Sequence, residues 1–111
     1  MQRLNESELV YRSGMSGVKY LVRGPHIDWG VILLLPGQKL DGHFHREVEE
    51  TFYGIQGKAS FTVNGEIVNT GTGDVLRMET GDIHSIENYG TDDFKVVFIK
   101  YPFLPQDKVD I

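Results

Sequence analysis

Residues 42–57 read GHFHREVEETFYGIQG, and the polar and apolar pattern of this stretch decides the fold. Two histidines, His43 and His45, stand two positions apart and are followed closely by glutamates. In a β-strand, side chains two residues apart lie on the same face of the sheet, so both imidazoles can approach one point. The stretch therefore predicts polar groups gathered on one face of a strand.

Three glutamates, Glu47, Glu49 and Glu50, compete for a place beside these histidines. Glu50 begins the next apolar run, and a strand packed alongside can bring its carboxylate to the same point. By strand parity Glu49 faces the opposite side, and Glu47 belongs to the connecting loop, so we expect both in solvent. A run of glutamates is by default a solvated surface, so only the combination with the histidines suggests a site.

His84 follows the turn at residues 81–82 and can supply a further imidazole. Neutral imidazole nitrogens with one carboxylate suit a divalent iron, manganese, nickel, copper or zinc ion. Four protein ligands leave about two open positions on an octahedral ion, which is room for water or a substrate. A pair of histidines alone, or a lone histidine after a turn, is weaker evidence, because such residues also occur on ordinary surfaces.

The rest of the chain has the pattern of short β-strands separated by tight turns. Thirteen glycines are more than average usage, and Asn64-Gly65 between two β-rich runs predicts a hairpin with a type I′ turn. Only the first dozen residues can tolerate a helical turn. The predicted strands span residues 18–23, 29–35, 50–56, 58–63, 66–69, 75–78, 84–88 and 94–101. This arrangement favours an all-β barrel or jelly roll, in which closure protects the strand edges.

Composition narrows the classes of function. The 111 residues fit one domain, and the net charge of −5, without a basic patch, argues against a nucleic-acid surface. The longest apolar run, residues 31–35, is far shorter than the roughly 20 residues of a membrane span. The chain has no cysteine and its N-terminus shows no signal peptide, so we expect a cytoplasmic protein.

Two segments resemble the sequence motifs of the cupin family. Residues 37–57 match the first motif: glycine, five residues, His-x-His, a spacer, glutamate, six residues and glycine. Residues 73–88 are similar to the second motif, which ends in histidine, three residues and asparagine. In the first motif six residues separate the glutamate from the glycine, and only Glu50 stands at that distance from Gly57.

The resemblance implies one cupin domain over residues 1–111, folded as a double-stranded β-helix or jelly-roll barrel. It also implies a divalent transition-metal ion (Fe, Mn, Ni, Zn or Cu) held by three histidines and one glutamate. The implied ligands are His43, His45, Glu50 and His84. Small cupins generally form dimers, so we expect a homodimer, and the terminal stretch YPFLP (residues 101–105) can either pack on its own barrel or reach another subunit.

The chain departs from the family pattern at two positions. Glu79 replaces a proline of the second motif, which removes some rigidity from a turn without touching the implied ligands. Gly54 replaces an aliphatic residue of the first motif. If Glu50 points inward, so does Gly54, which then marks a bulge or leaves space beside the metal. Of these two alternatives, our hypothesis is an enlarged pocket.

Other residues have less defined roles. We expect Phe52 and Ile86 to face the interior, while parity cannot decide which face of residues 94–101 does so, since both are largely apolar. Trp29 is expected in the core and His26 at the surface. Arg23, Arg77 and Lys100 can bind an anion if they point inward, although a surface position is the simpler expectation for each. Acid or base candidates not distinguished by spacing are Tyr53, Glu79, Asp82 and Tyr101.

Two classes of function remain. The first is a metal-dependent enzyme acting on a small polar metabolite, as a sugar or sugar-acid isomerase, a lyase or a dioxygenase. The second is a non-catalytic cupin that binds a sugar or another metabolite in the same pocket. We favour the enzyme, because a complete ligand set is a costly feature for binding alone; the fold by itself does not select the reaction.

Overall fold

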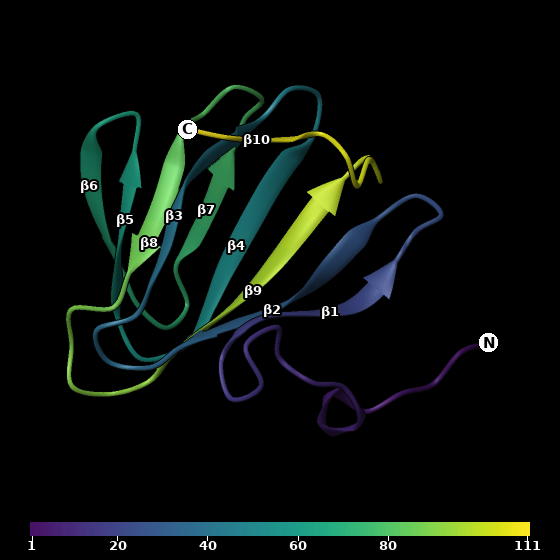
Figure 1. Cartoon of the computed structure of the whole chain (residues 1–111), viewed down its shortest axis with the longest axis horizontal. Helices are drawn as coiled ribbons and strands as arrows, with labels where there is room; N and C mark the ends of the chain where they lie inside the picture. The colour runs from purple at the N-terminus through teal and green to yellow at the C-terminus, as the bar shows by residue number, and fades with distance from the viewer.

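Two five-stranded antiparallel sheets face each other in the computed structural model, which describes residues 1–111 (Figure 1). One sheet has the order β1-β2-β9-β4-β7 and the other β10-β3-β8-β5-β6. The strands are β1 (Gly17–Arg23), β2 (Asp28–Leu34), β3 (Lys39–His45), β4 (Glu49–Gln56), β5 (Ala59–Val63), β6 (Glu66–Thr70), β7 (Val75–Met78), β8 (His84–Glu87), β9 (Phe94–Tyr101) and β10 (Lys108–Asp110). The expected all-β jelly-roll fold, a double-stranded β-helix, is confirmed.

Local sequence explains the turns at two places. Asn64 and Gly65 both adopt positive φ, 48° and 84°, as the predicted type I′ hairpin between β5 and β6 requires. The predicted helical turn near the N-terminus is a 3-10 turn, η1 (Glu6–Glu8), in which the Asn5 side chain accepts a hydrogen bond from the Ser7 N–H. It is the one helical element. No helix of the structure has both the length and the apolar character that crossing a bilayer requires.

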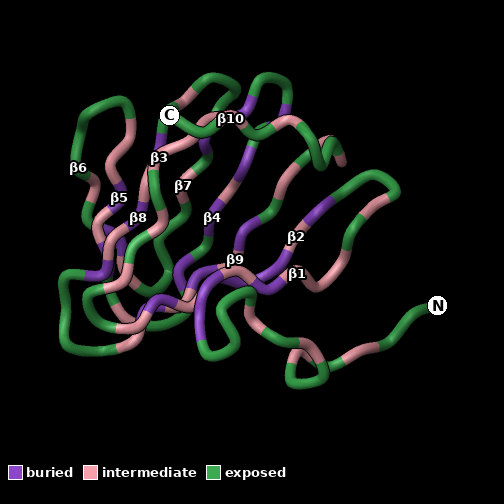
Figure 2. Tube along the Cα trace, in the orientation of Figure 1, coloured by how far each residue is buried: buried purple, intermediate pink, exposed green.

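The core lies between the sheets, where the buried segments of the strands face each other (Figure 2). β9 lies in the middle of its sheet, between β2 and β4. The structure shows which of the two faces of β9 points inward, a question that parity left open. Phe94, Val96 and Phe98 point inward and are at most 1% exposed. Lys100 continues the same inner face by strand parity. Phe52 and Ile86 belong to this core, as expected.

Trp29 corrects one expectation, because it is half-buried and lies outside the core cluster. It pairs with Ile99 on the outer face of the sheet, whereas the neighbouring Asp28 faces inward and is 2% exposed. A bulge in β1 between Tyr20 and Val22 shifts the parity of that strand. Residues on both sides of the bulge, Tyr20 and Arg23, consequently pair with inner-face residues of β2.

The C-terminal segment packs on its own barrel. The backbone N–H of Phe103 donates to the carbonyl of His26, and β10 then pairs with β3. Of the two alternatives for residues 101–105, the structure shows the intramolecular one. β10 consequently lies at the edge of the sheet beside the strand that carries His43 and His45.

Gly54 does not enlarge the pocket, so that hypothesis is wrong and the bulge alternative is right. The register between β4 and β9 shifts just after it, between Gly54 and Gln56. A Cβ atom at position 54 would overlap the carbonyl oxygen of Gly71, because the 71–74 turn packs directly on the glycine. Gly54 also donates its N–H to Asp74 O at 3.0 Å and accepts from Gly73 N at 2.8 Å. Glycine is needed here for close backbone approach.

A methyl group at this position tests that explanation. We expect Gly54→Ala to lower the free energy of unfolding by about 1–3 kcal/mol, because either the 71–74 turn or β4 must shift. Gly71→Ala is the matched control, since its added Cβ meets no atom closer than 3.7 Å. Urea unfolding of the two variants makes the comparison; equal stabilities would show that the turn gives way at no cost.

Candidate metal centre

Four side chains with metal-binding atoms converge between the two sheets. β3 and β8 contribute three histidines from one sheet, and β4 contributes a carboxylate from the other. These residues, called the His₃Glu cluster below, are His43, His45, Glu50 and His84. One ligand atom from each lies within 4.8 Å of the others. The sequence thus correctly predicted which histidines and which glutamate come together.

Strand pairing explains the convergence. His43 and His84 are direct partners across β3 and β8, and their ring centroids are 4.4 Å apart. His45 follows two residues later on the same strand and is 4% exposed. Glu50 is 3% exposed and enters from the opposite sheet, whereas Glu47 and Glu49 are exposed, as expected.

Hydrogen bonds orient the imidazole rings toward one another. Nδ1 of His84 lies 2.9 Å from Asp82 O, and Nδ1 of His43 lies 3.2 Å from Asp41 O. A carbonyl oxygen only accepts, so Nδ1 of His43 and of His84 donates to it, and Nε2 is the nitrogen that faces the cluster. The Nε2 atoms of His84 and His45 lie 3.2 and 3.1 Å from Glu50 Oε1. A cation that replaces the proton on these nitrogens would meet their lone pairs and the carboxylate around one point.

Electrostatics keeps the cluster in the ionisation states that favour metal binding. Burial and the neighbouring His84 lower the pKa of His43 to about 4, so its imidazole is neutral near pH 7. Burial alone would raise the pKa of Glu50, but hydrogen bonds from His45 and His84, with the charge of Lys100, lower it to about 2. The cluster therefore combines a neutral imidazole with a carboxylate that stays ionised.

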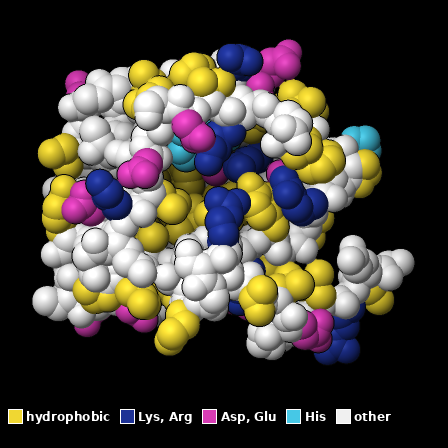
Figure 3. Space-filling view, in the orientation of Figure 1, with side chains coloured by type: hydrophobic (Ala, Val, Ile, Leu, Met, Phe, Trp, Pro, Cys, Tyr) yellow, Lys and Arg dark blue, Asp and Glu magenta, His cyan; other side chains and the backbone are white.

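A pocket of about 430 Å³ opens beside the cluster, and His43 and Glu50 form part of its wall. In the space-filling view the surface is hollowed here, with cationic side chains around the opening and a histidine visible at its edge (Figure 3). Half of the lining residues are apolar, and they include Ile32, Phe52 and Phe98 of the core. Such a volume and such walls are typical of sites for small molecules.

Two aspartate side chains accept backbone N–H groups in the loop and the turn that adjoin the cluster. The Asp107 carboxylate accepts N–H groups from Glu47 and Val48, both at 2.9 Å, in the loop between His45 and Glu50. Although burial acts to raise the pKa of Asp107, these donors lower it. In the turn before His84, the Asp82 carboxylate accepts from Glu79 N at 2.9 Å.

Several residues considered from the sequence lie elsewhere. None of the four acid or base candidates lines the pocket: Tyr53, Glu79 and Tyr101 are exposed, and Asp82 stabilises a turn. Arg77 is exposed beside Glu79, and His26 is exposed, as expected. Arg23 binds Asp28 through two nitrogens, each at 3.1 Å.

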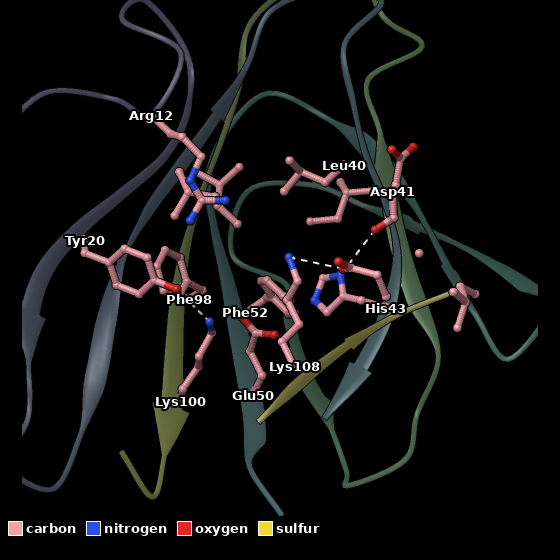
Figure 4. A pocket seen from close by; sticks show the side chains of 16 residues that line it. Arg12, Tyr20, Leu40, Asp41, His43, Glu50, Phe52, Phe98, Lys100 and Lys108 are labelled. Atoms are coloured by element: carbon pink, nitrogen blue, oxygen red, sulfur yellow. Dashed lines mark hydrogen bonds and ion pairs between the residues drawn. The ribbon is translucent and has the colours of Figure 1, made fainter. Parts of the chain in front are cut away.

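Lys100 lines the pocket, contrary to the simpler expectation of a surface position. Its ammonium donates to the Tyr20 hydroxyl at 2.8 Å (Figure 4). Among the pocket residues that were not singled out from the sequence are Tyr20 and Arg12. Tyr20 was hidden in a strand whose parity the bulge interrupts, and Arg12 lies in a segment without periodicity.

Comparison with known proteins gives one family. The sequence model of the cupin domain family matches residues 30–100 of this chain. The tetracenomycin polyketide synthase protein TcmJ of Streptomyces glaucescens is 34% identical over 80 residues, which are 72% of this chain and 54% of that protein. The chain therefore spans about half the length of this curated relative.

Two solved structures are similar over nearly the whole chain. An uncharacterised Klebsiella pneumoniae protein with a double-stranded β-helix domain superposes with a TM-score of 0.85 at 21% identity, covering 99% of this chain and 96% of that one. The polyketide cyclase RemF of Streptomyces resistomycificus gives a TM-score of 0.83 at 14% identity, covering 100% and 85%. At these identities the likeness concerns the fold alone.

The pKa of His43 generates a prediction about stability in the metal-free protein. The unfolded chain protonates this histidine near pH 6.5, but the folded chain does so only near pH 4. Between these values the unfolded state binds more protons, so stability falls as pH decreases. We expect His43→Asn to reduce that fall, measured as the urea midpoint from about pH 7 to about pH 4.5.

The exposed His26 supplies the matched control, since His26→Asn should leave the pH dependence unchanged. The low pKa of Glu50 acts below this window, because its stabilisation is lost only as pH falls from about 4.5 to about 2. Identical slopes for wild type and His43→Asn would contradict the assignment of a buried, neutral imidazole.

Proposed function

This chain belongs to the cupin family, and from that premise we propose that its His₃Glu cluster binds a divalent transition-metal ion. The observation that carries the proposal is the convergence of four ligand atoms within 4.8 Å, beside a pocket of about 430 Å³. Three imidazoles and one carboxylate suit iron, manganese, nickel, copper or zinc. The two backbone carbonyls that orient His43 and His84 support the same assignment, because metal-binding histidines usually donate their second N–H.

We further propose that the protein is a metal-dependent enzyme acting on a small oxygen-bearing metabolite. When bound, the metal would act as a Lewis acid toward a carbonyl or hydroxyl oxygen, or as an oxygen-binding centre in a dioxygenase. The chain itself supplies Tyr20, the one hydroxyl that lines the pocket. Lys100 donates to this hydroxyl at 2.8 Å and orients it. Tyr20 can hold or transfer a proton inside the pocket, as an isomerase or a lyase requires.

TcmJ is named as a polyketide synthase protein and RemF as a polyketide cyclase. These names suggest ring closure of a polyketide as a further candidate reaction of related chemistry. Closing a ring on a chain of carbonyl groups also needs an activated carbonyl oxygen and a proton transfer at carbon. The second candidate is a cupin that binds a metabolite without converting it. It is favoured by the state of the pocket acids Asp41 and Asp110, each of which pairs with a lysine, so neither is a free base.

Elemental analysis of the protein purified without added metal is the direct test. We expect about one transition-metal ion per chain, lost as the pH falls toward about 4, where His43 protonates, because a protonated histidine does not coordinate. Iron would favour oxygen chemistry, whereas manganese, nickel or zinc would favour an isomerase or a lyase. Unchanged metal content in the His45→Ala variant would overturn the ligand assignment.

Ligand variants sharpen this prediction. Loss of an outer-shell partner already costs roughly 10- to 100-fold in metal affinity, so we expect His45→Ala and His84→Ala to cost more than about 100-fold. The fold should persist, because the core residues lie in other strand positions. Zinc titration calorimetry on His26→Ala, an exposed histidine outside the cluster, gives the matched control.

Turnover separates the two candidate functions. Oxygen uptake and product formation would be followed with a panel of small acids, sugars and polycarbonyl compounds, using the metal-loaded protein. Conversion that requires both the metal and Tyr20 supports the enzyme, and saturable binding without conversion supports the binding protein. The single domain over residues 1–111, the homodimer and the cytoplasmic location stay predictions.

A further inference from the structure

We propose that the pocket binds an organic anion with an apolar body, and that Arg12 and Lys100 hold its carboxylate. The inference rests on the proposed function in one respect, since it takes the pocket beside the His₃Glu cluster as the substrate site. It narrows the small polar metabolite to an aromatic or otherwise apolar carboxylate, and it moves away from a sugar.

Lys100 belongs to a row of charges that crosses the inner face of one sheet. Its cross-strand partners are Asp28 on β2 and Glu50 on β4. Both acids already have other partners. Asp28 accepts two hydrogen bonds from Arg23, each at 3.1 Å, while Glu50 accepts from the histidines of the cluster. No carboxylate oxygen lies within 4.0 Å of the Lys100 ammonium, although this residue is half-buried.

The surroundings of the Lys100 ammonium leave donors free for a ligand. It makes one hydrogen bond, to the Tyr20 hydroxyl, and lies 5.2 and 5.4 Å from the ring centroids of Tyr20 and Phe98. An ammonium has three N–H donors, so two remain. A partly desolvated cation without a carboxylate in direct contact is stabilised when an anion binds beside it.

Arg12 supplies the second cation. Its backbone N–H donates to Val18 O at 2.8 Å, which anchors the segment at the start of β1. The guanidinium forms no ion pair with any acid of the chain. Figure 4 shows Arg12, Tyr20 and Lys100 along one side of the pocket, with His43 on the other side. A planar guanidinium matches a carboxylate through two parallel hydrogen bonds.

The remaining charges on the pocket wall balance one another. Lys108 lies 3.4 Å from Asp110, and Asp41 lies 3.8 Å from Lys39. The cations without partners are therefore concentrated at Arg12 and Lys100. This concentration makes the side of the pocket opposite His43 positive.

The composition of the pocket wall indicates the chemistry of the part of the ligand beyond its carboxylate. None of the residues that line the pocket is a serine, threonine, asparagine or glutamine. The walls between the charged groups are aliphatic and aromatic, with Val18, Ile32, Leu40, Phe52, Ile86 and Phe98 among them. Hydroxyl groups of a sugar that lie against the apolar part of the wall would lose hydrogen bonds to water and find no partners there, at a cost in binding free energy. An aromatic or unsaturated body buries its surface there favourably.

Three probes of similar size test the proposal: 2-naphthoate, its uncharged amide 2-naphthamide, and gluconate, which has a carboxylate on a hydroxylated body. Calorimetric titrations would be made with zinc-loaded and with metal-free full-length protein. We expect 2-naphthoate to bind at least about tenfold more tightly than either of the other two, because only it satisfies both the cations and the apolar walls.

Two variants identify the groups that hold the carboxylate. Arg12→Gln and Lys100→Met should each weaken 2-naphthoate binding by at least about tenfold and leave 2-naphthamide binding unchanged. Arg77→Gln is the matched control, an exposed arginine outside the pocket. Melting temperatures of all variants verify folding, and Arg12→Gln is decisive by itself because Arg12 is exposed.

The metal-free titrations separate this inference from the proposed function. If 2-naphthoate binding persists without metal and depends on Arg12 and Lys100, the anion site stands even if zinc fails to bind the wild type. If zinc binds to the cluster but 2-naphthoate does not bind, or binds equally well to both variants, the anion site is refuted and the metal centre stands. Equal affinities for 2-naphthoate and gluconate would overturn the inference that the ligand has an apolar body.

Discussion

One electrostatic constraint organises the site: a buried carboxylate of one sheet faces three imidazoles of the other. Glu50 is 3% exposed, and burying its charge is costly unless donors or a cation compensate. His45 and His84 supply hydrogen bonds, and the orientation of the imidazole rings provides for a cation. Because β4 lies in one sheet and β3 and β8 lie in the other, the same contacts join the two halves of the barrel. The site and the sheet packing are thus parts of one arrangement.

The sequence predicted the parts of this arrangement that depend on spacing. Two-residue parity placed His43 with His45 and separated Glu49 from Glu50, and turn chemistry located the hairpin at Asn64-Gly65. Parity could not assign a face to β9, whose two faces are both largely apolar, and only the position of β9 between β2 and β4 settled it. Tyr20 was not singled out from the sequence, and one extra residue in β1 changes which side chains of that strand face inward. Gly54 was misjudged because the turn that occupies its space lies 17 residues further along the chain, at Gly71.

The pocket distinguishes this chain from the fold that it shares with others. Similar structures at 14–21% identity share the double-stranded β-helix, and a fold of this kind supports many reactions. What can differ among them is the wall around the cluster. In this chain half of the wall is apolar, and Tyr20 and Lys100 in it are hydrogen-bonded to each other at 2.8 Å. Substrate choice is therefore to be sought in β1, β9 and the segment before β1, and less in the residues of the His₃Glu cluster.

The tie between Asp107 and the loop at Glu47 has a consequence for the order in which the protein assembles. Asp107 and Glu47 are 60 positions apart in the sequence. Lys95 and Glu6, which also contact each other, are 89 positions apart. Contacts of such separation close large loops and form slowly compared with local turns. During synthesis, β3, β4 and β8 emerge long before the segment that braces them. We therefore expect the pocket to mature late in folding, so that an ion or a ligand meets a finished barrel more often than a nascent one.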